Sequence, residues 1–283
     1  MGNPTSLAPT VAARATARAS HGGGPEPGRR WARFRIHQPL GAGGMGTVYA
    51  AYEPELDRMV ALKVPLPAMA GSGHAHEQLR REAQAMARVC HAGVVPIHTL
   101  GEFRGWTYYT MALVRGVSFR AHFATPRPWA EIRRAFLDVA RALAAIHAAG
   151  VVHRDVKPSN LLYGDDGRVR ITDFGIASPV VTDESSSGTP AYMAPEQLRG
   201  AFGDDRTDQF SFGVTLFEAL HRVSPFDGVH PEERLRAIAA GPRPAPSRVP
   251  GTLDGIARRA LSAARSDRFP DMHAVVAELA AAA

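Results

Sequence analysis

The sequence predicts an α+β fold in two parts: a small antiparallel β-sheet region with one helix, then a larger, mainly helical region. Two observations carry this prediction. From Phe34 the chain shows short alternating apolar runs broken by glycine and proline, which is typical of strands. After Gly116 apolar residues recur every three or four positions, which is typical of helices that bury one face.

The order of these patterns divides the chain into a tail and one folded domain. Residues 1–33 are rich in Ala, Thr, Ser, Arg, Gly and Pro and are predicted to form a disordered basic tail. The folded domain is expected over 34–283, with its sheet-rich lobe at about 34–114 and its helical lobe at about 115–283.

Strands and one helix are expected in the first lobe. The strands are predicted at 47–51, 59–64, 94–98 and 107–111, and the helix at 76–89.

The second lobe begins with the clearest helical pattern of the chain, at 129–149. Ile132, Phe136 and Val139 belong to a single apolar stripe along it, and Gly150 follows as a C-terminal capping glycine. Further helices are predicted at 208–220, 231–239, 253–263 and 272–281.

Composition favours a protein of the cell interior without a membrane span. The chain has 283 residues, 45% of them hydrophobic, and lacks the run of about 18 apolar residues that a span requires. Its single cysteine, Cys90, cannot form an internal disulfide and is expected to be buried. We therefore expect a cytoplasmic location.

The basic character of the chain is concentrated at one end. The net charge is +6, and residues 1–33 hold five Arg against one Glu. Because little positive charge is left for the domain, a nucleic-acid partner is not expected.

Lysine is nearly absent, and its two positions are informative. The chain has 31 Arg and 2 Lys, and the lysines are Lys63 and Lys157. A phosphate-facing position can require the compact ammonium group of lysine, so both residues are candidates for phosphate chemistry.

A glycine-rich segment precedes the first lysine. Residues 41–46 read Gly-Ala-Gly-Gly-Met-Gly, a pattern that dinucleotide-binding folds and ordinary turns also contain. Here a strand pattern follows at 47–51, where a dinucleotide-binding loop would open a helix. The sequence therefore favours a hairpin whose backbone amides cover phosphates.

Lys63 and Glu82 form a candidate pair. Lys63 lies in the next predicted strand, and Glu82 lies in the middle of the predicted helix. The alternative is that both are solvated, which is the usual fate of charged side chains.

Three later motifs complete the pattern: His153-Arg154-Asp155 through Asn160, Asp173-Phe174-Gly175, and Ala194-Pro195-Glu196. In order and spacing, these motifs together with the glycine hairpin and Lys63 resemble the eukaryotic-type protein kinase family, in particular its bacterial Ser/Thr branch. The resemblance runs from about Phe34 to the C-terminus, and it implies the two-lobed kinase fold.

The resemblance implies a role for each polar residue in phosphoryl transfer from ATP. Asp155 would orient the substrate hydroxyl and accept its proton, and Lys157 would steady the γ-phosphate. Asn160 and Asp173 would hold Mg²⁺, or Mn²⁺ in its place. Lys63, held by Glu82, would bind the α- and β-phosphates.

The same resemblance implies a nucleotide site made of the glycine hairpin and apolar side chains. The expected ATP-binding residues are Leu40, Gly41, Ala42, Gly43, Gly44, Met45, Gly46, Thr47, Val48, Ala61, Lys63, Met111, Ala112, Leu113, Val114 and Leu162. The hinge contacts use the backbone of Ala112, Leu113 and Val114, so an alanine where the family often has an acidic residue leaves nucleotide binding intact.

Regulation and substrate choice are implied for the activation segment. Lys157 and Thr189 resemble the Ser/Thr branch, with Thr189 beside the acceptor hydroxyl. Arg154 resembles the arginine that pairs with a phosphate on that segment. The candidate phosphate acceptors are Thr182, Ser185, Ser186 and Ser187.

Two structural roles are also implied. Glu196 and Arg268 would form a buried ion pair, and Asp208 would brace the backbone near His153 and Arg154.

The expected function is therefore that of a signalling protein kinase that phosphorylates Ser and Thr of protein substrates, including its own activation segment. A catalytically silent pseudokinase scaffold is the alternative, but it should have lost Lys63, Asp155 or Asp173, and all three are present. A small-molecule phosphotransferase would lack the Ala194-Pro195-Glu196 motif. The substrate, input signal and oligomeric state stay open.

Overall fold

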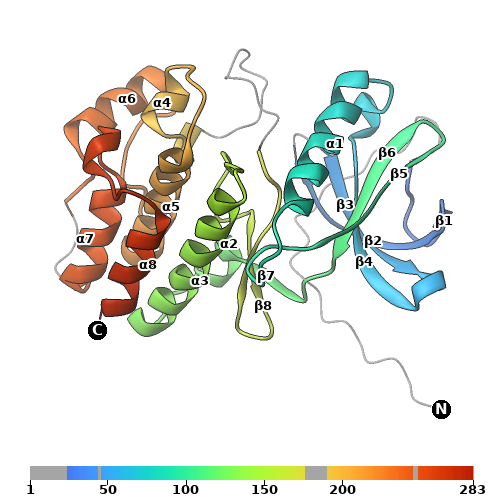
Figure 1. Ribbon diagram of the computed structural model, residues 1–283, viewed down its shortest axis with the longest axis horizontal. Helices are drawn as coiled ribbons and strands as arrows, with labels where there is room; N and C mark the ends of the chain where they lie inside the picture. The colour runs from blue at the N-terminus through green and yellow to red at the C-terminus, as the bar shows by residue number, and fades with distance from the viewer. Residues whose placement is uncertain (1–23, 44–45, 176–189, 245–247, 283) are drawn as a thin grey trace. The chain divides into compact units, whose positions relative to one another are not determined.

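The computed structural model describes residues 24–43, 46–175, 190–244 and 248–282 (Figure 1). These residues form two compact units. The first comprises the chain up to Arg80 together with 97–117, and the second comprises 81–96 together with 118–283. The sequence predicts a single boundary between the two lobes near residue 114. In the structure, residues 81–96 of the predicted first lobe belong to the second unit instead.

The first unit contains a six-stranded sheet with the order β1-β2-β3-β4-β6-β5, in which neighbouring strands are antiparallel. The strands are β1 (Arg30–Trp31), β2 (Phe34–Gly43), β3 (Gly46–Glu53), β4 (Arg58–Val64), β5 (Ile97–Phe103) and β6 (Trp106–Ala112). The helix α1 (Gly73–Ala87) begins in this unit and ends in the second, and the short strand β7 (Gly116–Ser118) contains the other junction.

The hydrophobic core of the first unit lies on one face of the sheet. Val60, Leu62 and Val64 of β4 belong to it, and they pack in a cluster with Trp31 and Phe34. Because side chains alternate along a strand, Ala61 and Lys63 point to the opposite face. The apolar residues of β4 thus fix the direction in which Lys63 points.

The second unit is mainly helical, with one β-hairpin. Its elements are α2 (Phe119–His122), α3 (Trp129–Ala148), β8 (Leu161–Gly164), β9 (Val169–Ile171), α4 (Pro195–Leu198), α5 (Asp205–His221), α6 (Pro231–Ala240), α7 (Gly251–Ala260) and α8 (Met272–Ala281). Helix α3 packs against α5 and α8, and α7 packs against α5 and α8 as well (Figure 1).

Helix α5 is the centre of the second unit. Its residues are buried on nearly every side, including Phe210, Phe212 and Phe217, as expected for a helix surrounded by others. The helix α3 ends as the sequence predicts, because Gly150 adopts a left-handed conformation with φ +70° just after it.

Several helix boundaries differ from the prediction, and the helix expected at 76–89 is α1 at Gly73–Ala87. The helix expected at 208–220 begins at Asp205, because the Asp204 carboxylate caps it by accepting from the backbone N–H of Arg206 and Thr207. The helix expected at 253–263 is α7, which ends at Ala260.

The folded part of the chain was predicted to begin at residue 34, but it begins earlier in the structure. Arg30 and Trp31 form β1 against β2, and the Trp31 ring is buried against Phe103 and Tyr108. The predicted tail over 1–33 is therefore wrong for its last residues, because a single buried tryptophan anchors them. Residues 1–23 lie outside the described residues.

The strand expected at 94–98 is displaced. The strand β5 runs from Ile97 to Phe103, while Val94 makes an isolated bridge to Ile171 in the second unit. The apolar run at 94–97 therefore combines a bridge residue with the start of β5. The alternation of apolar and polar residues does not distinguish these two pairings.

Cys90 is exposed, so the predicted burial of this residue is wrong. It follows the buried Val89 just after α1 ends, where the chain turns outward.

Candidate active site

Consecutive strands of the first unit place three predicted nucleotide residues in one row. Gly41 of β2 pairs with Val48 of β3, and Val48 pairs with Lys63 of β4. Paired residues of antiparallel strands project to the same face, so Val48 and Lys63 share the face opposite the core. Ala61, two residues from Lys63, lies on that face and pairs with Met111 of β6.

The Lys63 side chain is buried, with 5% of its surface exposed, and its Nζ lies 5.8 Å from the centre of the Tyr109 ring. Glu82 is also buried, with 1% exposed. The alternative that both residues are solvated surface charges is therefore wrong. Lys63 belongs to the first unit and Glu82 to the second, and their pairing stays a prediction.

The remaining residues predicted to bind the nucleotide lie in β2, at the end of β6 and in β8. Leu40 is half-buried near the end of β2, and Gly41, Ala42 and Gly43 are exposed in the hairpin arm. Ala112, Leu113 and Val114 are half-buried where β6 ends, and Leu162 lies in β8 of the second unit. Gly44 and Met45 lie outside the described residues.

Gly46 is required by its surroundings. A Cβ at this position would lie 2.2 Å from the carbonyl oxygen of Val64. Only glycine allows β3 to approach β4 so closely at this point. The last glycine of the motif therefore fixes the start of β3, where it precedes Thr47 and Val48.

In the second unit, Asp155 lies between a cation and an amide. Lys157 Nζ lies 2.8 Å from Asp155 Oδ2, and Asn160 Nδ2 donates to the same oxygen at 2.9 Å. Both donors hold the carboxylate in one orientation.

Asn160 connects two predicted motifs. Its Nδ2 also donates to the carbonyl oxygens of Asp155, at 2.9 Å, and Asp173, at 3.4 Å. The hairpin of β8 and β9 separates Asn160 from Asp173 in sequence and returns the chain to the same place.

The donor set near Asn160 fits a divalent cation of the magnesium type. With its nitrogen engaged, Asn160 has its Oδ1 free of the amide contacts to Asp155 and Asp173 and accepts there from Ser159, while the backbone carbonyl of Asp173 lies 3.4 Å from its Nδ2. The described residues contain no cluster of three His, Cys, Asp or Glu that could hold a metal. Few protein oxygens, completed by water and phosphate, are what Mg²⁺ commonly uses.

The buried His153 side chain holds the backbone of the loop that contains Asp155. Its ring is fully buried, its Nε2 donates to the carbonyl oxygen of Thr172 at 3.1 Å, and its Nδ1 accepts from the N–H of Asp155 at 3.2 Å. Burial lowers the pKa of His153, more than the nearby Asp208 raises it. A neutral ring with one donor and one acceptor suits these two contacts.

Asp208 holds the loop from α5. Its carboxylate accepts from the N–H of His153 at 2.7 Å and of Arg154 at 2.6 Å, and it also contacts His147 Nε2 at 2.8 Å. Arg154 has a φ of +66°, which is unfavourable for a side chain larger than glycine. The two hydrogen bonds that the backbone donates to the fully buried Asp208 carboxylate stabilise that conformation.

The Asp173-Phe174-Gly175 turn is held equally close. Asp173 has a φ of +56°, Phe174 is buried against the His153 ring, and Gly175 N–H donates to the carbonyl oxygen of His153. A Cβ on Gly175 would lie 2.6 Å from the Cβ of Asp155. The glycine therefore allows the turn to contact the residue expected to act as the base.

The structure brings Glu196 and Arg268 together as a bidentate pair, with Nη1 to Oε1 at 2.9 Å and Nη2 to Oε2 at 3.1 Å. Thr207 also donates to Glu196 Oε1. Burial raises the pKa of Glu196, but the hydrogen bond and charge of Arg268 outweigh it, so the pKa lies below its ordinary value.

Several residues that support the site were not predicted from the sequence. Gln197 Nε2 donates to the carbonyl oxygen of Arg154 at 3.0 Å, and Tyr192 donates to Glu218 at 2.7 Å. No local pattern marks these residues, because each partner is at least 26 positions away. The predicted activation-segment residues Thr182, Ser185, Ser186, Ser187 and Thr189 lie outside the described residues.

The first unit has a buried lysine on its sheet, and the second has a loop in which a lysine and an asparagine contact one aspartate carboxylate. Each of these features is expected of a protein kinase domain. A family model described as the protein kinase domain matches residues 34–275. The chain therefore belongs to the protein kinase family.

Curated relatives are bacterial Ser/Thr protein kinases. The chain is 40% identical over 273 residues to the Serine/threonine-protein kinase pkn2 of Myxococcus xanthus, covering 88% of this chain and 32% of that protein. It is 35% identical over 259 residues to PknF of Mycobacterium tuberculosis, covering 86% of this chain and 54% of that protein. The chain thus spans about half the length of these relatives, or less.

The fold is also similar to a solved kinase domain. The crystal structure of the PknI kinase domain of M. tuberculosis matches with a TM-score of 0.70 and 30% identity, covering 90% of this chain and 98% of that one. The predicted α+β kinase fold is confirmed. No helix among the described residues is long and apolar enough to cross a membrane.

Proposed function

We propose that this chain is an active Ser/Thr protein kinase that transfers the γ-phosphate of ATP to hydroxyls of protein substrates, its own included. The observation that carries the proposal is the cluster around Asp155, in which Lys157 and Asn160 lie 2.8 and 2.9 Å from one carboxylate oxygen. Such a cluster positions reactants and balances charge, which is most of what phosphoryl transfer requires.

The reaction assigns one task to each group. The Asp155 carboxylate orients the substrate hydroxyl and accepts its proton as the oxygen attacks the γ-phosphorus. The Lys157 ammonium neutralises charge on the γ-phosphate oxygens, and Lys63 binds the α- and β-phosphates. The backbone of the glycine hairpin at 41–46 covers the phosphates.

Asn160 and Asp173 would hold Mg²⁺, which when bound neutralises phosphate oxygens and orients them. The contribution of the protein is to aim these two side chains. The Nδ2 bonds of Asn160 fix its amide plane, and the hydrogen bond from Gly175 to His153 fixes the turn that carries Asp173. The apolar face with Val48, Ala61 and Met111 suits an adenine ring.

The test is incubation of the purified chain with labelled ATP and magnesium, alone and with a generic basic protein. We expect label on wild type and at least a hundredfold less on Asp155→Asn and Lys63→Met. Asp165→Asn is the matched control, because Asp165 is exposed on the turn after β8. ATP binding without label on any substrate would favour the pseudokinase scaffold, which the named relatives do not support.

We also propose that the chain acts in the cytoplasm as a signalling enzyme. A single cysteine and the absence of a long apolar run in the sequence support this location. Fractionation of cells that produce the tagged chain tests it, and recovery with membranes would contradict it.

A further inference from the structure

Three side chains hold the backbone that leads to Asp155, and one of them was not predicted from the sequence. The Asp208 carboxylate accepts from the N–H groups of His153 and Arg154. The His153 ring accepts from the N–H of Asp155 at 3.2 Å. The third side chain is Gln197 of α4, whose Nε2 donates to the carbonyl oxygen of Arg154 at 3.0 Å.

The peptide group that joins Arg154 to Asp155 is thereby fixed at both of its polar atoms. Its carbonyl oxygen accepts from Gln197, and its N–H donates to His153. A planar peptide group can turn only about the backbone bonds on its two sides. Holding both polar atoms therefore sets the direction in which the Asp155 side chain leaves the chain.

The other end of the Gln197 amide holds the segment that leads into α4. Its Oε1 accepts from the N–H of Ala194 at 3.0 Å, and Ala194 is fully buried. Only one orientation of the amide satisfies both partners, because the opposite one would turn Oε1 toward the Arg154 carbonyl and Nε2 toward the Ala194 N–H. Position 197 thus requires a donor and an acceptor at the same time.

Capping of the helix explains only half of these contacts. A glutamine at the third position of a helix often reaches back to the N–H of the residue before the helix, as Gln197 does with Ala194. That contact uses the oxygen alone. The nitrogen donates instead to a carbonyl 43 positions away, in the loop of Asp155.

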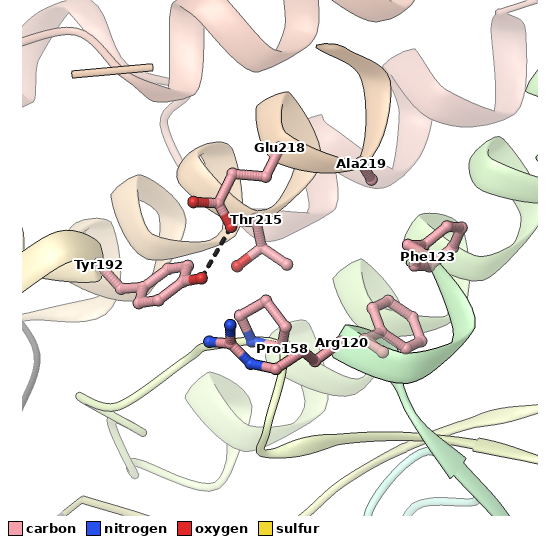
Figure 2. A pocket seen from close by; sticks show the side chains of 8 residues that line it. Arg120, Phe123, Pro158, Tyr192, Thr215, Glu218 and Ala219 are labelled. Carbon is pink, nitrogen blue, oxygen red and sulfur yellow. Dashed lines mark hydrogen bonds between the residues drawn. The ribbon is translucent and has the colours of Figure 1, made fainter. Parts of the chain in front are cut away.

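The segment before α4 is itself anchored to α5 through Tyr192. The Tyr192 carbonyl oxygen accepts from Ser211 Oγ at 2.7 Å, and its hydroxyl donates to Glu218 Oε2 at 2.7 Å (Figure 2). Helix α5 also carries Asp208, so one helix anchors both this segment and the loop of Asp155. Gln197 joins the two directly.

We propose that Gln197 is a positioning residue for Asp155, which couples the place of residues 190–194 to the peptide group before the base. The inference rests on the proposed function and adds to it a residue that acts through the backbone. A general base works only within hydrogen-bond reach of the proton that it accepts. Displacement of residues 190–194 should therefore release the peptide group and turn Asp155 away from the substrate hydroxyl.

The first test is Gln197→Met, which keeps the length of the side chain and removes both polar contacts. We expect kcat to fall about 10- to 100-fold, because a small misplacement of a catalytic group has an effect of this size. The KM for ATP should stay within about twofold, since the residues predicted to bind the nucleotide lie elsewhere. Gln84→Met, at an exposed position of α1, is the matched control and should leave both constants unchanged.

The second test uses the protonation of Gln197→Glu. An ionised carboxylate accepts from Ala194 but cannot donate to the Arg154 carbonyl, whereas a protonated carboxyl does both. Partial burial against a carbonyl oxygen raises the pKa of the introduced carboxyl, so it should gain its proton as the pH falls from about 8 to about 5.5. We expect the ratio of wild-type to variant kcat to shrink over this range.

Two comparisons isolate that signal. Dividing by the wild-type rate at each pH removes the titration of the groups that both proteins share around this loop, which include His153, Asp155 and Asp208. The ratio for Gln197→Met should not change with pH, because methionine has no proton to gain. Gln84→Glu should give a ratio near one throughout.

Hydrogen exchange measures the coupling without any activity. In Gln197→Met we expect the N–H groups of Asp155 and Ala194 to exchange about tenfold faster or more, because one loses a fixed peptide plane and the other its acceptor. Exchange in α7 and the melting temperature should change little. Gln84→Met should exchange like wild type.

An unchanged kcat in Gln197→Met, or a Gln197→Glu ratio that is independent of pH, would overturn the proposal. Faster exchange throughout the second unit would also overturn it, because Gln197 would then serve only the stability of the fold. If wild type transfers no phosphate, the proposed function fails and exchange alone decides. Faster exchange confined to Asp155 and Ala194 would still support the coupling, and unchanged exchange would contradict it.

Discussion

Two polar clusters of the second unit each contain a carboxylate paired with a cationic side chain, but they differ in how far these side chains are exposed to solvent. In the Asp155 cluster the side chains of Asp155 and Lys157 are 32% and 24% exposed. In the Glu196 cluster the side chains of Glu196 and Arg268 are 8% and 0% exposed. The first remains accessible to a substrate, and the second is closed.

The hydrogen bonds of the two clusters also differ. Arg268 donates to Glu196 and also to the carbonyl oxygens of Ser262, Ala263 and Arg206, which ties four segments together. In the Asp155 cluster the bonds through His153 and Asp208 fix the backbone, and the Asp155 side chain stays about one-third exposed. Removing a charge should therefore cost activity in the first cluster and stability in the second.

The largest effect is expected at Asp155. Asp155→Asn keeps the shape and the exposure but removes the proton acceptor, so the turnover number should fall about 10²- to 10⁴-fold. The melting temperature should change little, because the side chain is one-third exposed. Steady-state kinetics and thermal unfolding of the same sample measure both, and a large loss of stability would break the comparison.

Arg268→Ala should have the reverse signature. It leaves the buried Glu196 carboxylate without its bidentate partner, which typically costs about 3–5 kcal/mol of unfolding free energy. Urea unfolding of the full chain measures the loss. Arg170→Ala is the control: it breaks the exposed pair with Asp166 and should cost less than about 1 kcal/mol. Equal costs in both variants would contradict the distinction between closed and open clusters.

Features that depend on residues close together in sequence could be predicted from the sequence alone. The resemblance placed Asp155, Asn160 and Asp173 in one site, and the loop and hairpin bring their backbone and amide groups together. Local periodicity located most helices, as at α3, which buries one apolar stripe. Both features depend on residues close together in sequence.

Features that depend on distant partners could not be predicted. Trp31 is ordered by Phe103 and Tyr108, Val94 pairs with Ile171, and no local pattern encodes these contacts. The same applies to the hydrogen bond between Tyr192 and Glu218, which are 26 positions apart in sequence.

Asp208 holds the loop of the Asp155 cluster, and its neighbour Thr207 donates to Glu196. Asp208→Asn should therefore have an intermediate effect on both turnover and stability. The asparagine carbonyl can accept one of the two N–H groups of His153 and Arg154, and its amide nitrogen would face the other donor. We expect a loss of about 1–3 kcal/mol in stability together with reduced turnover. Asp271→Asn, at the capped start of α8, is the control and should be nearly neutral, because asparagine also caps helices.

The smallest effect is expected from pH. The folded pKa of Glu196 lies below its ordinary value of 4.5, so its ionised form stabilises the fold above that pH and the contribution is lost as the pH falls through the folded pKa. The stability difference between wild type and Glu196→Gln should therefore shrink below about pH 4.5.

Glu218 should show the opposite dependence on pH, because burial raises its pKa. Its ionised form is disfavoured in the folded state, so the contribution of Glu218 to stability decreases as the pH rises above its ordinary pKa. Urea unfolding of both Gln variants from pH 3.5 to 7 measures the two slopes, and slopes of the same sign would show that the closed pair with Arg268 does not set Glu196 apart.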